Sequence, residues 1–371
     1  MLPLPGGDGA IGTTVRGMST KRLIQPLVLV AAAALVLSGC ATPPEDTGTD
    51  SAQKFCAVMV TNSGGLDDRS FNQSSWAGLE TAQEDLGIDA QVLVSTSETD
   101  LAPNVQAAVD TGCGFILTVG YELNPATTEQ AELNPDVDFA IIDEIVDAPN
   151  VKSVVFDTAQ AAYLAGYLAA GTSKTGKVAT FGGGNQPPVT LFMDGFVDGV
   201  AKYNEVHGAA VVALGWDKTA QDGVFTGDFE DTAKGLATAQ GFIDQGADVI
   251  LPVAGQVGEG AAAAALASGG VSIIWVDNDG FDTLPSEYRG LLLTSVLKNT
   301  GEAVQEIVAT SLDGSFTNES FVGTLENGGV ALAPFHDLAG SVPAELATEI
   351  DGLRAAIIDG SLVVTSPSAP R

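Results

Sequence analysis

The feature that most constrains this chain is a regular alternation of short apolar runs with longer segments of helical spacing. Residues 55–61 form a continuous apolar run that ends in the polar turn NSGG, and a helical stretch follows from about Ser70. Similar runs lie at residues 90–94, 114–119 and 138–142. Continuous apolar runs are typical of strands buried on both faces, and their alternation with helices favours βαβ units. The sequence therefore predicts an α/β fold built on a parallel sheet with helices on both faces.

The second half of the chain repeats this pattern at a constant offset. Residues 110–120 (DTGCGFILTVG) resemble residues 244–255 (DQGADVILPVAG), and residues 139–143 (FAIID) resemble residues 273–277 (IIWVD). Both matches are 134 residues apart (244 − 110 and 277 − 143). Because two separate strands share the offset, we predict two lobes of the same topology.

This repeat places Asp143 and Asp277 at equivalent positions, each at the carboxyl end of a predicted parallel strand. Ligands of open α/β sheets bind at that edge, so two facing lobes would direct both carboxylates into one cleft. The alternative is that each Asp only caps the helix that follows it.

The chain has 371 residues, which at roughly 150 residues per domain predicts two domains. Its charge argues against one class of function, nucleic-acid binding. Lys and Arg number 15 against 47 Asp and Glu, a net charge of −32 (15 − 47). The positive surface that attracts phosphate backbones is therefore missing, and we expect no nucleic-acid partner.

The N-terminal segment is typical of an export signal. Lys21 and Arg22 precede the apolar residues 27–37, a run that suits a signal-peptide core better than a bilayer span. The run ends in LSGC at residues 37–40, which resembles the lipobox of bacterial lipoproteins. We expect a signal peptide at residues 1–39 with the true start at Met18, and a lipid on Cys40 that anchors the protein to the extracytoplasmic face of the cell membrane. A short buried helix that ends at a chance Cys is the alternative.

The polar, acidic residues 40–53 show no apolar periodicity and predict a flexible linker to the lipid anchor. Two further cysteines, Cys56 and Cys113, each lie at the start of a predicted strand. Disulfides persist outside the cytoplasm, so these residues form either a disulfide bridge or two small buried thiols.

Aromatic residues follow the first strand of each half. Phe71 begins the first helix, and Phe192 occupies the corresponding helix of the second half, whereas Phe196 is expected in the core. An aromatic face beside amide and carboxylate groups suits a planar heterocycle, since stacking of a base contributes roughly 1–3 kcal/mol. The alternative is that Phe71 simply begins the apolar stripe of its helix.

The remaining candidates follow strands of the second half. An ionised Asp277 can accept two hydrogen bonds from the vicinal hydroxyls of a ribose. Lys298 is expected to donate to ribose oxygens and to neutralise Asp277, or else to be a surface Lys at a strand end. Gly255 begins a loop that lacks the order of a dinucleotide-binding or P-loop motif, so we expect backbone contacts with a neutral ligand and no cofactor. Residues 277–282 lack the Gly and Glu positions of a calcium loop, and we expect no metal.

Four short motifs resemble the basic membrane lipoprotein (BMP) family of nucleoside-binding lipoproteins of ABC transporters, related to the purine nucleoside receptor. Residues 68–73 (DRSFNQ) resemble the family's DKSFNQ signature. Residues 163–166 (YLAG), 195–199 (GFVDG) and 252–255 (PVAG) resemble three further family motifs. The similarity extends from about residue 54 to residue 363.

The resemblance implies a type I periplasmic-binding-protein fold, in which two doubly wound parallel-sheet lobes are joined by three crossing strands. We expect an N-terminal lobe of residues 54–156 plus 298–320 and a C-terminal lobe of residues 157–297 plus 321–371, in a monomer.

The resemblance also assigns roles to eight residues. It places the base between Phe71 and Phe192, with Phe229 as the rival of Phe192. It gives the polar edge of the base to Asn62, Asn72 and Asp143, and the ribose to Gly255, Asp277 and Lys298. Asn62 departs from the Asp that is usual in the family, which changes an acceptor into a group that donates and accepts.

The function implied is a receptor that binds a nucleoside, a purine nucleoside in our prediction, and delivers it to an ABC permease without catalysis. A receptor for a sugar or a signalling molecule with the same fold is one alternative. A nucleoside hydrolase is another, although the chain has only two His residues and no HExxH or GxSxG motif.

Overall fold

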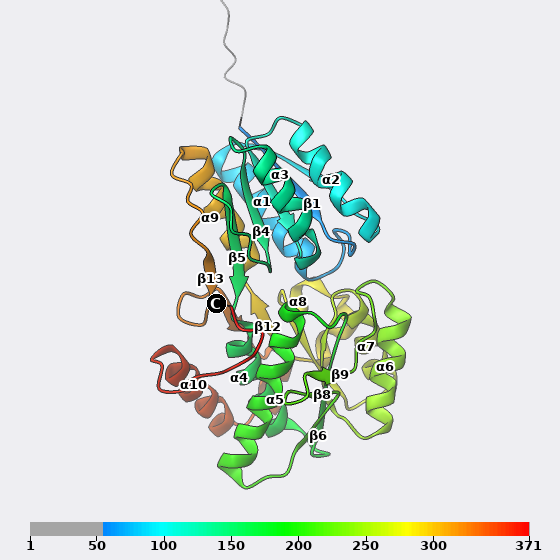
Figure 1. Ribbon diagram of the computed structural model, residues 1–371. Helices are drawn as coiled ribbons and strands as arrows, with labels where there is room; N and C mark the ends of the chain where they lie inside the picture. Colours follow the sequence, from blue (N-terminus) through cyan, green and yellow to red (C-terminus); the bar gives the residue numbers. More distant parts are fainter. Residues whose placement is uncertain (1–54, 371) are drawn as a thin grey trace, which may run out of the picture. The chain divides into compact units, whose positions relative to one another are not determined.

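The computed structural model describes residues 55–370, which contain two six-stranded sheets of matching strand order (Figure 1). The first sheet has the order β13-β5-β4-β3-β1-β2 and the second the order β14-β12-β11-β10-β6-β7. All pairings within the sheets are parallel except that of β12 with β14. The predicted α/β fold of two doubly wound lobes is thus confirmed.

The strands of the first sheet are β1 (Cys56–Thr61), β2 (Asp89–Leu93), β3 (Phe115–Val119), β4 (Asp138–Ile142), β5 (Val151–Phe156) and β13 (Phe321–Gly323). Those of the second sheet are β6 (Lys177–Gly182), β7 (Val212–Leu214), β10 (Val249–Val253), β11 (Ser272–Asp277), β12 (Leu292–Lys298) and β14 (Val330–Leu332). A small hairpin joins β8 (Trp216–Asp217) and β9 (Asp222–Gly223).

The first sheet carries α1 (Phe71–Leu86), α2 (Glu98–Asp110), α3 (Asn124–Leu133) and α9 (Thr300–Asp313), with the short helix η1 (Tyr121–Leu123). The second carries α4 (Thr158–Thr172), α5 (Pro187–His207), α6 (Thr232–Asp244), α7 (Val257–Ser268), α8 (Gly280–Thr283) and α10 (Ala344–Ile358). Two more short helices, η2 (Ser286–Leu291) and η3 (His336–Ser341), complete the fold.

The repeat seen in the sequence corresponds to equivalent strands. β3 begins 134 residues before β10, and β4 begins 134 residues before β11. Asp143 and Asp277, which follow or end these strands, both have a left-handed backbone, with φ of 70° and 65°. Non-glycine residues adopt this region rarely, and Asp does so more readily than most. The two lobes therefore share strand order and the backbone turn that ends the corresponding strand.

The chain passes between the sheets three times. It leaves the first sheet after β5, returns after β12 so that α9 packs on α1, and leaves again after β13. β13 pairs with β5 through Phe321 and Val154. The predicted lobe boundary at residues 320/321 therefore falls too early, because the next strand still belongs to the first sheet. β13 has only three residues, and nothing in their sequence indicates which of the two sheets they join.

The first sheet is buried on both faces, which explains its continuous apolar strands. In β1, Val58 and Val60 pack in one apolar cluster while Ala57 and Met59 pack in another on the opposite face. All four side chains are fully buried. Alternate residues of a strand point to opposite faces, so a strand covered by helices on both sides requires apolar residues at every position.

Helices α4 and α5 pack closely because glycines lie at their contacts. A Cβ on Gly199 would lie 2.0 Å from the carbonyl oxygen of Tyr163, and one on Gly166 would lie 2.0 Å from that of Phe196. These glycines belong to the YLAG and GFVDG motifs. The two motifs are thus the two sides of one helix contact, in which a larger residue would force the backbones apart.

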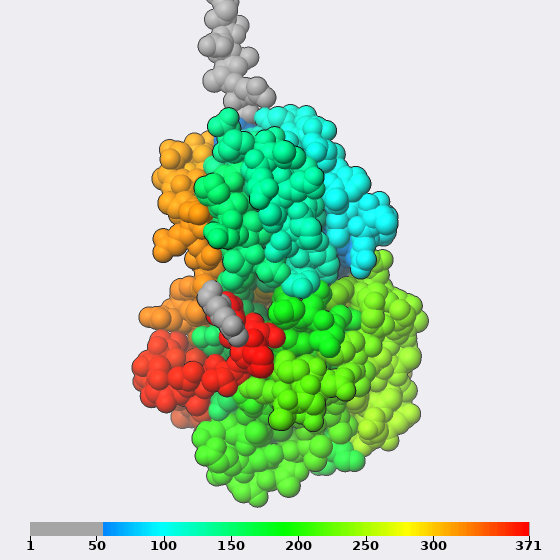
Figure 2. Space-filling view, viewed as in Figure 1, coloured from blue at the N-terminus to red at the C-terminus, as the bar shows by residue number. Residues whose placement is uncertain are grey.

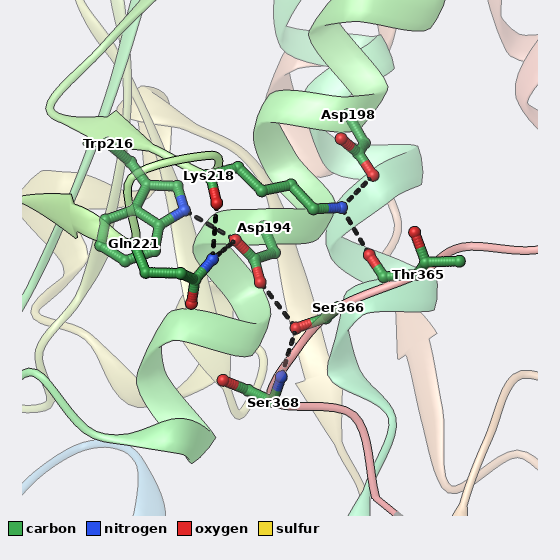
Figure 3. Close-up of polar contacts among 8 residues, drawn as sticks. All are labelled: Asp194, Asp198, Trp216, Lys218, Gln221, Thr365, Ser366 and Ser368. Carbon is green, nitrogen blue, oxygen red and sulfur yellow. Dashed lines mark hydrogen bonds and ion pairs between the residues drawn. The ribbon is translucent and has the colours of Figure 1, made fainter.

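The C-terminal residues after α10 contact α5 through the pairs Ser366–Asp194 and Ser368–Thr190, and in Figure 2 the red C-terminal surface adjoins the green surface. Figure 3 shows that buried Asp194 accepts hydrogen bonds from Trp216 Nε1 (2.8 Å), Gln221 Nε2 (3.0 Å) and Ser366 Oγ (2.6 Å). Lys218 bridges Asp198 and the carbonyl oxygen of Thr365. The tail is therefore fixed to α5 and to the β8–β9 hairpin. Its end, residues 367–370, lines a second cavity with Ile145 and Val155 of the first lobe.

The predicted signal peptide, Met18, Cys40 and the linker lie outside the described residues. Within residues 55–370, no helix combines the length and the apolar character that crossing a bilayer requires.

A disulfide joins Cys56, at the start of β1, to Cys113, just before the adjacent β3. It closes a loop with a sequence separation of 57. The loss of unfolded-state entropy from a loop of that size corresponds to about 4 kcal/mol.

We therefore predict that reduction lowers the melting temperature of the protein, while the Cys56→Ser/Cys113→Ser variant melts at a single, low temperature with or without reductant. Calorimetry under both conditions measures this. An equal response of the two proteins to reductant would show that the bridge contributes no stability.

Candidate functional site

Polar and aromatic side chains of both lobes line a cavity of about 610 Å³. Its walls come from residues that end or follow parallel strands, including Asn62 after β1, Asp143 after β4, Gly255 after β10 and Lys298 at the end of β12. The carboxyl edges of both sheets therefore meet at this cavity, where open α/β sheets bind ligands. Seven of the eight predicted site residues line it: Asn62, Phe71, Asp143, Phe192, Gly255, Asp277 and Lys298.

Asn72 is the predicted residue that does not line the cavity. Its Nδ2 donates a hydrogen bond of 2.7 Å to Asn62 Oδ1, and its own Oδ1 is buried without a partner among the described residues. Asn72 therefore lies behind Asn62 and fixes the orientation of the Asn62 amide.

Asp68 lines the cavity at the N-terminus of α1. Its carboxylate accepts hydrogen bonds from the backbone N–H groups of Ser70 (3.0 Å), Asn72 (2.7 Å) and Gln73 (3.1 Å). These are donors that an isolated helix end leaves unpaired. Burial, together with the charge of Asp277, raises the pKa of Asp68 to about 6 against the opposing effect of the backbone hydrogen bonds. The Asp of the hexapeptide DRSFNQ thus caps α1 at the cavity wall.

The second lobe holds the loop that precedes α1. Ser70 Oγ donates to Asp277, and Asn278 Nδ2 donates to the Ser70 carbonyl at 2.8 Å. Trp275 Nε1 donates to the carbonyl of Arg69 at 3.2 Å. Arg69 has a left-handed φ of 59°, and its Nε lies 3.6 Å from Glu259. The two lobes are therefore hydrogen-bonded to each other at the edge of the cavity.

Lys298 forms its ion pair with Asp143 of the first lobe, not with Asp277 as the sequence predicted. Both ends are nearly buried, with side-chain exposures of 3% and 10%. Burial raises the pKa of Asp143 and the Lys298 charge opposes that shift. The partner differs because Asp143 and Asp277 come from facing lobes, and sequence alone does not show which carboxylate lies within reach of the ammonium.

The ammonium of Lys298 also lies over the ring of Phe71, 4.5 Å from its centroid. This is within the range of a cation–π contact. One face of Phe71 is therefore covered, so a planar ligand must use the other face or displace the ammonium.

Two phenylalanines of the second lobe line the cavity. Phe192 is only 2% exposed, whereas Phe229 is half-buried. The Phe229 ring packs over Gly183, where a Cβ would lie 2.4 Å from the ring, and it also lies beside Gly255. A stacked base needs an accessible ring face, and Phe229 offers more of one than Phe192.

Asp68 and Ser70 also line the cavity, and the sequence before α1 indicates them as candidate caps of that helix. The sequence did not indicate several other lining residues: Tyr121, Glu122, Gln186, Pro188 and Val189. Tyr121, Glu122 and Gln186 come from the turn after β3 and the start of α5, where no motif marks them. Among residues 55–370, no group of three or more His, Cys, Asp or Glu side chains is arranged to hold a metal ion.

The pKa of Asp68 predicts a specific dependence of stability on pH. The ordinary value is 3.8 and the folded value about 6, so the unfolded chain releases this proton first as pH rises. The contribution of Asp68 to the free energy of unfolding should therefore fall between pH 4 and 6, by about 3 kcal/mol, and stay constant above.

The measurement is the difference in unfolding free energy between the protein and Asp68→Asn across this range. Asp67→Asn removes the same charge from the exposed neighbouring position and serves as the control. A difference for Asp68→Asn that does not vary with pH would contradict the raised pKa.

Comparison with known proteins identifies the family. Residues 55–364 match the Bmp family, described as "ABC transporter substrate-binding protein PnrA-like". The ABC transporter nucleoside-binding protein BmpA of Lactococcus lactis is 30% identical over 366 residues, which cover 93% of this chain and 99% of that protein. Basic membrane protein A1 of Borrelia garinii is 30% identical over 314 residues, covering 83% and 87% of the two chains.

Solved structures agree on the fold. A solute-binding protein of an ABC transporter from Aeropyrum pernix superposes with a TM-score of 0.75 at 23% identity, over 84% of this chain and 94% of that one. A second, from Conexibacter woesei, has a TM-score of 0.65 at 22% identity, over 85% and 100% of the two chains. The architecture is that of type I periplasmic binding proteins, and the chain belongs to the Bmp family of PnrA-like ABC transporter substrate-binding proteins.

Proposed function

We propose that this substrate-binding protein encloses a purine nucleoside between its two lobes and delivers it to the permease of an ABC transporter. The observation that carries the proposal is the composition of the cavity. An aromatic ring from each lobe, Phe71 and Phe229, lies on its wall together with amide and carboxylate groups. Such a site matches a planar base with polar edges joined to a hydroxyl-bearing sugar.

Each part of the nucleoside has a candidate partner. Phe71 and Phe229 stack on the base, and the buried Phe192 also lines the cavity on the side of the second lobe. Asn62 binds the polar edge of the base, held by Asn72. Asp277, Lys298 and the backbone at Gly255 bind the ribose, and Asp143 holds Lys298 in position. The relative from Lactococcus lactis is named a nucleoside-binding protein, which supports the same ligand class here.

The chemistry of the cavity favours binding without catalysis. His207 pairs with Glu349 (2.9 Å) and His336 with Asp279 (2.7 Å), and neither His lines the cavity. The carboxylates of Asp68 and Asp143 are engaged by backbone N–H groups and by Lys298. These two carboxylates are therefore held by other groups and are not placed to activate water as the general base of a hydrolase.

We further propose that the protein acts on the extracytoplasmic face of the cell membrane as a monomer, anchored by a lipid on Cys40. The residues that carry this proposal are the signal-like segment and the LSGC sequence. The disulfide between Cys56 and Cys113 supports it, because such bridges persist outside the cytoplasm.

Incubation of the purified protein with inosine, adenosine or ribose tests the proposed function. Saturation with a nucleoside at 100 times its Kd should stabilise the fold by about 2.7 kcal/mol, and the nucleoside should be recovered intact. Release of free base would instead indicate a hydrolase. Stabilisation by ribose but not by nucleosides would indicate a sugar receptor.

The aromatic walls give a separate prediction. Phe71→Ala and Phe229→Ala should each weaken nucleoside binding by roughly 1–3 kcal/mol, because each removes one stacking face. Phe192→Ala should affect binding less, although loss of its buried ring should lower the free energy of unfolding by about 3–5 kcal/mol. Titration calorimetry and melting curves measure the two effects. A larger loss of affinity for Phe192→Ala than for Phe229→Ala would make Phe192 the second wall.

A further inference from the structure

Glu122 is a cavity residue to which neither the sequence motifs nor the roles above assign a function. It lies in η1, directly after β3, and its side chain lines the cavity. Burial raises the pKa of Glu122, while contacts with its own backbone N–H and with the side chain of Gln186 oppose that shift. Gln186 precedes α5 of the second lobe, so Glu122 is held at the junction of the two lobes.

Glu122 lies beside Asn62. Gly120 separates them, and a Cβ added to this glycine would lie 2.9 Å from Glu122 Oε2 and 3.3 Å from Asn62 Nδ2. Both polar ends therefore surround the same small space. Gly120 has a φ of 127°, a conformation that suits only glycine, so the backbone itself keeps this space clear of a side chain.

The hydrogen bonds of Asn62 define which of its atoms faces a ligand. Its Oδ1 already accepts from Gly64 N (3.2 Å) and from Asn72 Nδ2 (2.7 Å). An amide oxygen has two lone pairs, so both are engaged. Asn62 therefore offers its Nδ2 donor, and the neighbouring acceptor is the carboxylate of Glu122.

The other carboxylates of the cavity have defined partners. Asp68 caps α1, Asp143 pairs with Lys298, and Asp277 accepts from Ser70 Oγ. Glu122 Oε2 lies next to Asn62 at Gly120, so Glu122 is the acid placed to contact a ligand at that end of the cavity.

We propose that Glu122 is a specificity-determining residue that accepts a hydrogen bond from the edge of the base, while Asn62 Nδ2 donates to the adjacent acceptor of that edge. This inference rests on the proposed nucleoside function. The pair selects bases that carry an N–H donor beside an acceptor. Hypoxanthine and adenine both do so, whereas the unsubstituted purine of purine riboside has no donor on this edge.

The test compares inosine, adenosine and purine riboside by titration calorimetry. The unaltered protein should bind inosine or adenosine about 10- to 100-fold more tightly than purine riboside, as loss of a hydrogen bond to a charged group predicts. In Glu122→Ala this ratio should fall towards 1, chiefly through weaker binding of inosine and adenosine. Glu122→Gln retains an acceptor oxygen and should recover part of the ratio.

Glu98→Gln is the matched control. Glu98 is exposed on α2, acts on Glu122 only through its charge, and does not line the cavity, so this variant should keep the full ratio. Melting curves verify that each variant is folded. A ratio that persists in Glu122→Ala, or one near 1 in the unaltered protein, would overturn the role of Glu122 while leaving nucleoside binding intact. Failure of the unaltered protein to bind all three ligands would overturn the proposed function itself.

Discussion

The ion pair between Lys298 and Asp143 is the interaction on which the site depends most. Lys298 ends a strand of the second sheet and Asp143 follows a strand of the first, so the pair joins the lobes inside the cavity that they share. Removing one partner of a buried pair leaves an unpaired charge, which costs about 3–5 kcal/mol. The same ammonium lies over Phe71. One side chain therefore couples the approach of the lobes to the position of an aromatic wall.

The internal repeat explains why acidic groups converge at this place. Equivalent strands end in the same left-handed turn at Asp143 and Asp277, and the facing lobes bring both carboxylates to one cavity. The two residues have nevertheless diverged in their contacts. Asp143 binds the ammonium of Lys298, whereas Asp277 accepts a hydroxyl from the loop before α1. Asp143 and Asp277 thus share a backbone conformation but have different hydrogen-bond and ion-pair partners.

The architecture can be predicted from the sequence because each buried strand produces a continuous run of apolar residues. The run at β4 matches the predicted strand residue for residue, since buried strands require apolar residues throughout. Shorter elements such as β13 and the β8–β9 hairpin carry too few residues for a pattern. Lys298, a predicted site residue, lines the cavity, but its ion-pair partner depends on the distance between the lobes. Glu122 lies in the three-residue helix η1, which is too short for a periodic signal, and the sequence left the choice between Phe229 and Phe192 open.

The charges of the cavity limit the kind of guest that it can hold. Its lining contains the carboxyl groups of Asp68, Glu122, Asp143 and Asp277 against the single ammonium of Lys298. Lys298 is already paired, so an added phosphate would meet uncompensated negative charge in a partly desolvated space, where repulsion is stronger than in water. An uncharged guest rich in N–H and O–H donors meets acceptors at both ends instead. The balance of charge therefore favours the proposed nucleoside over its phosphorylated forms.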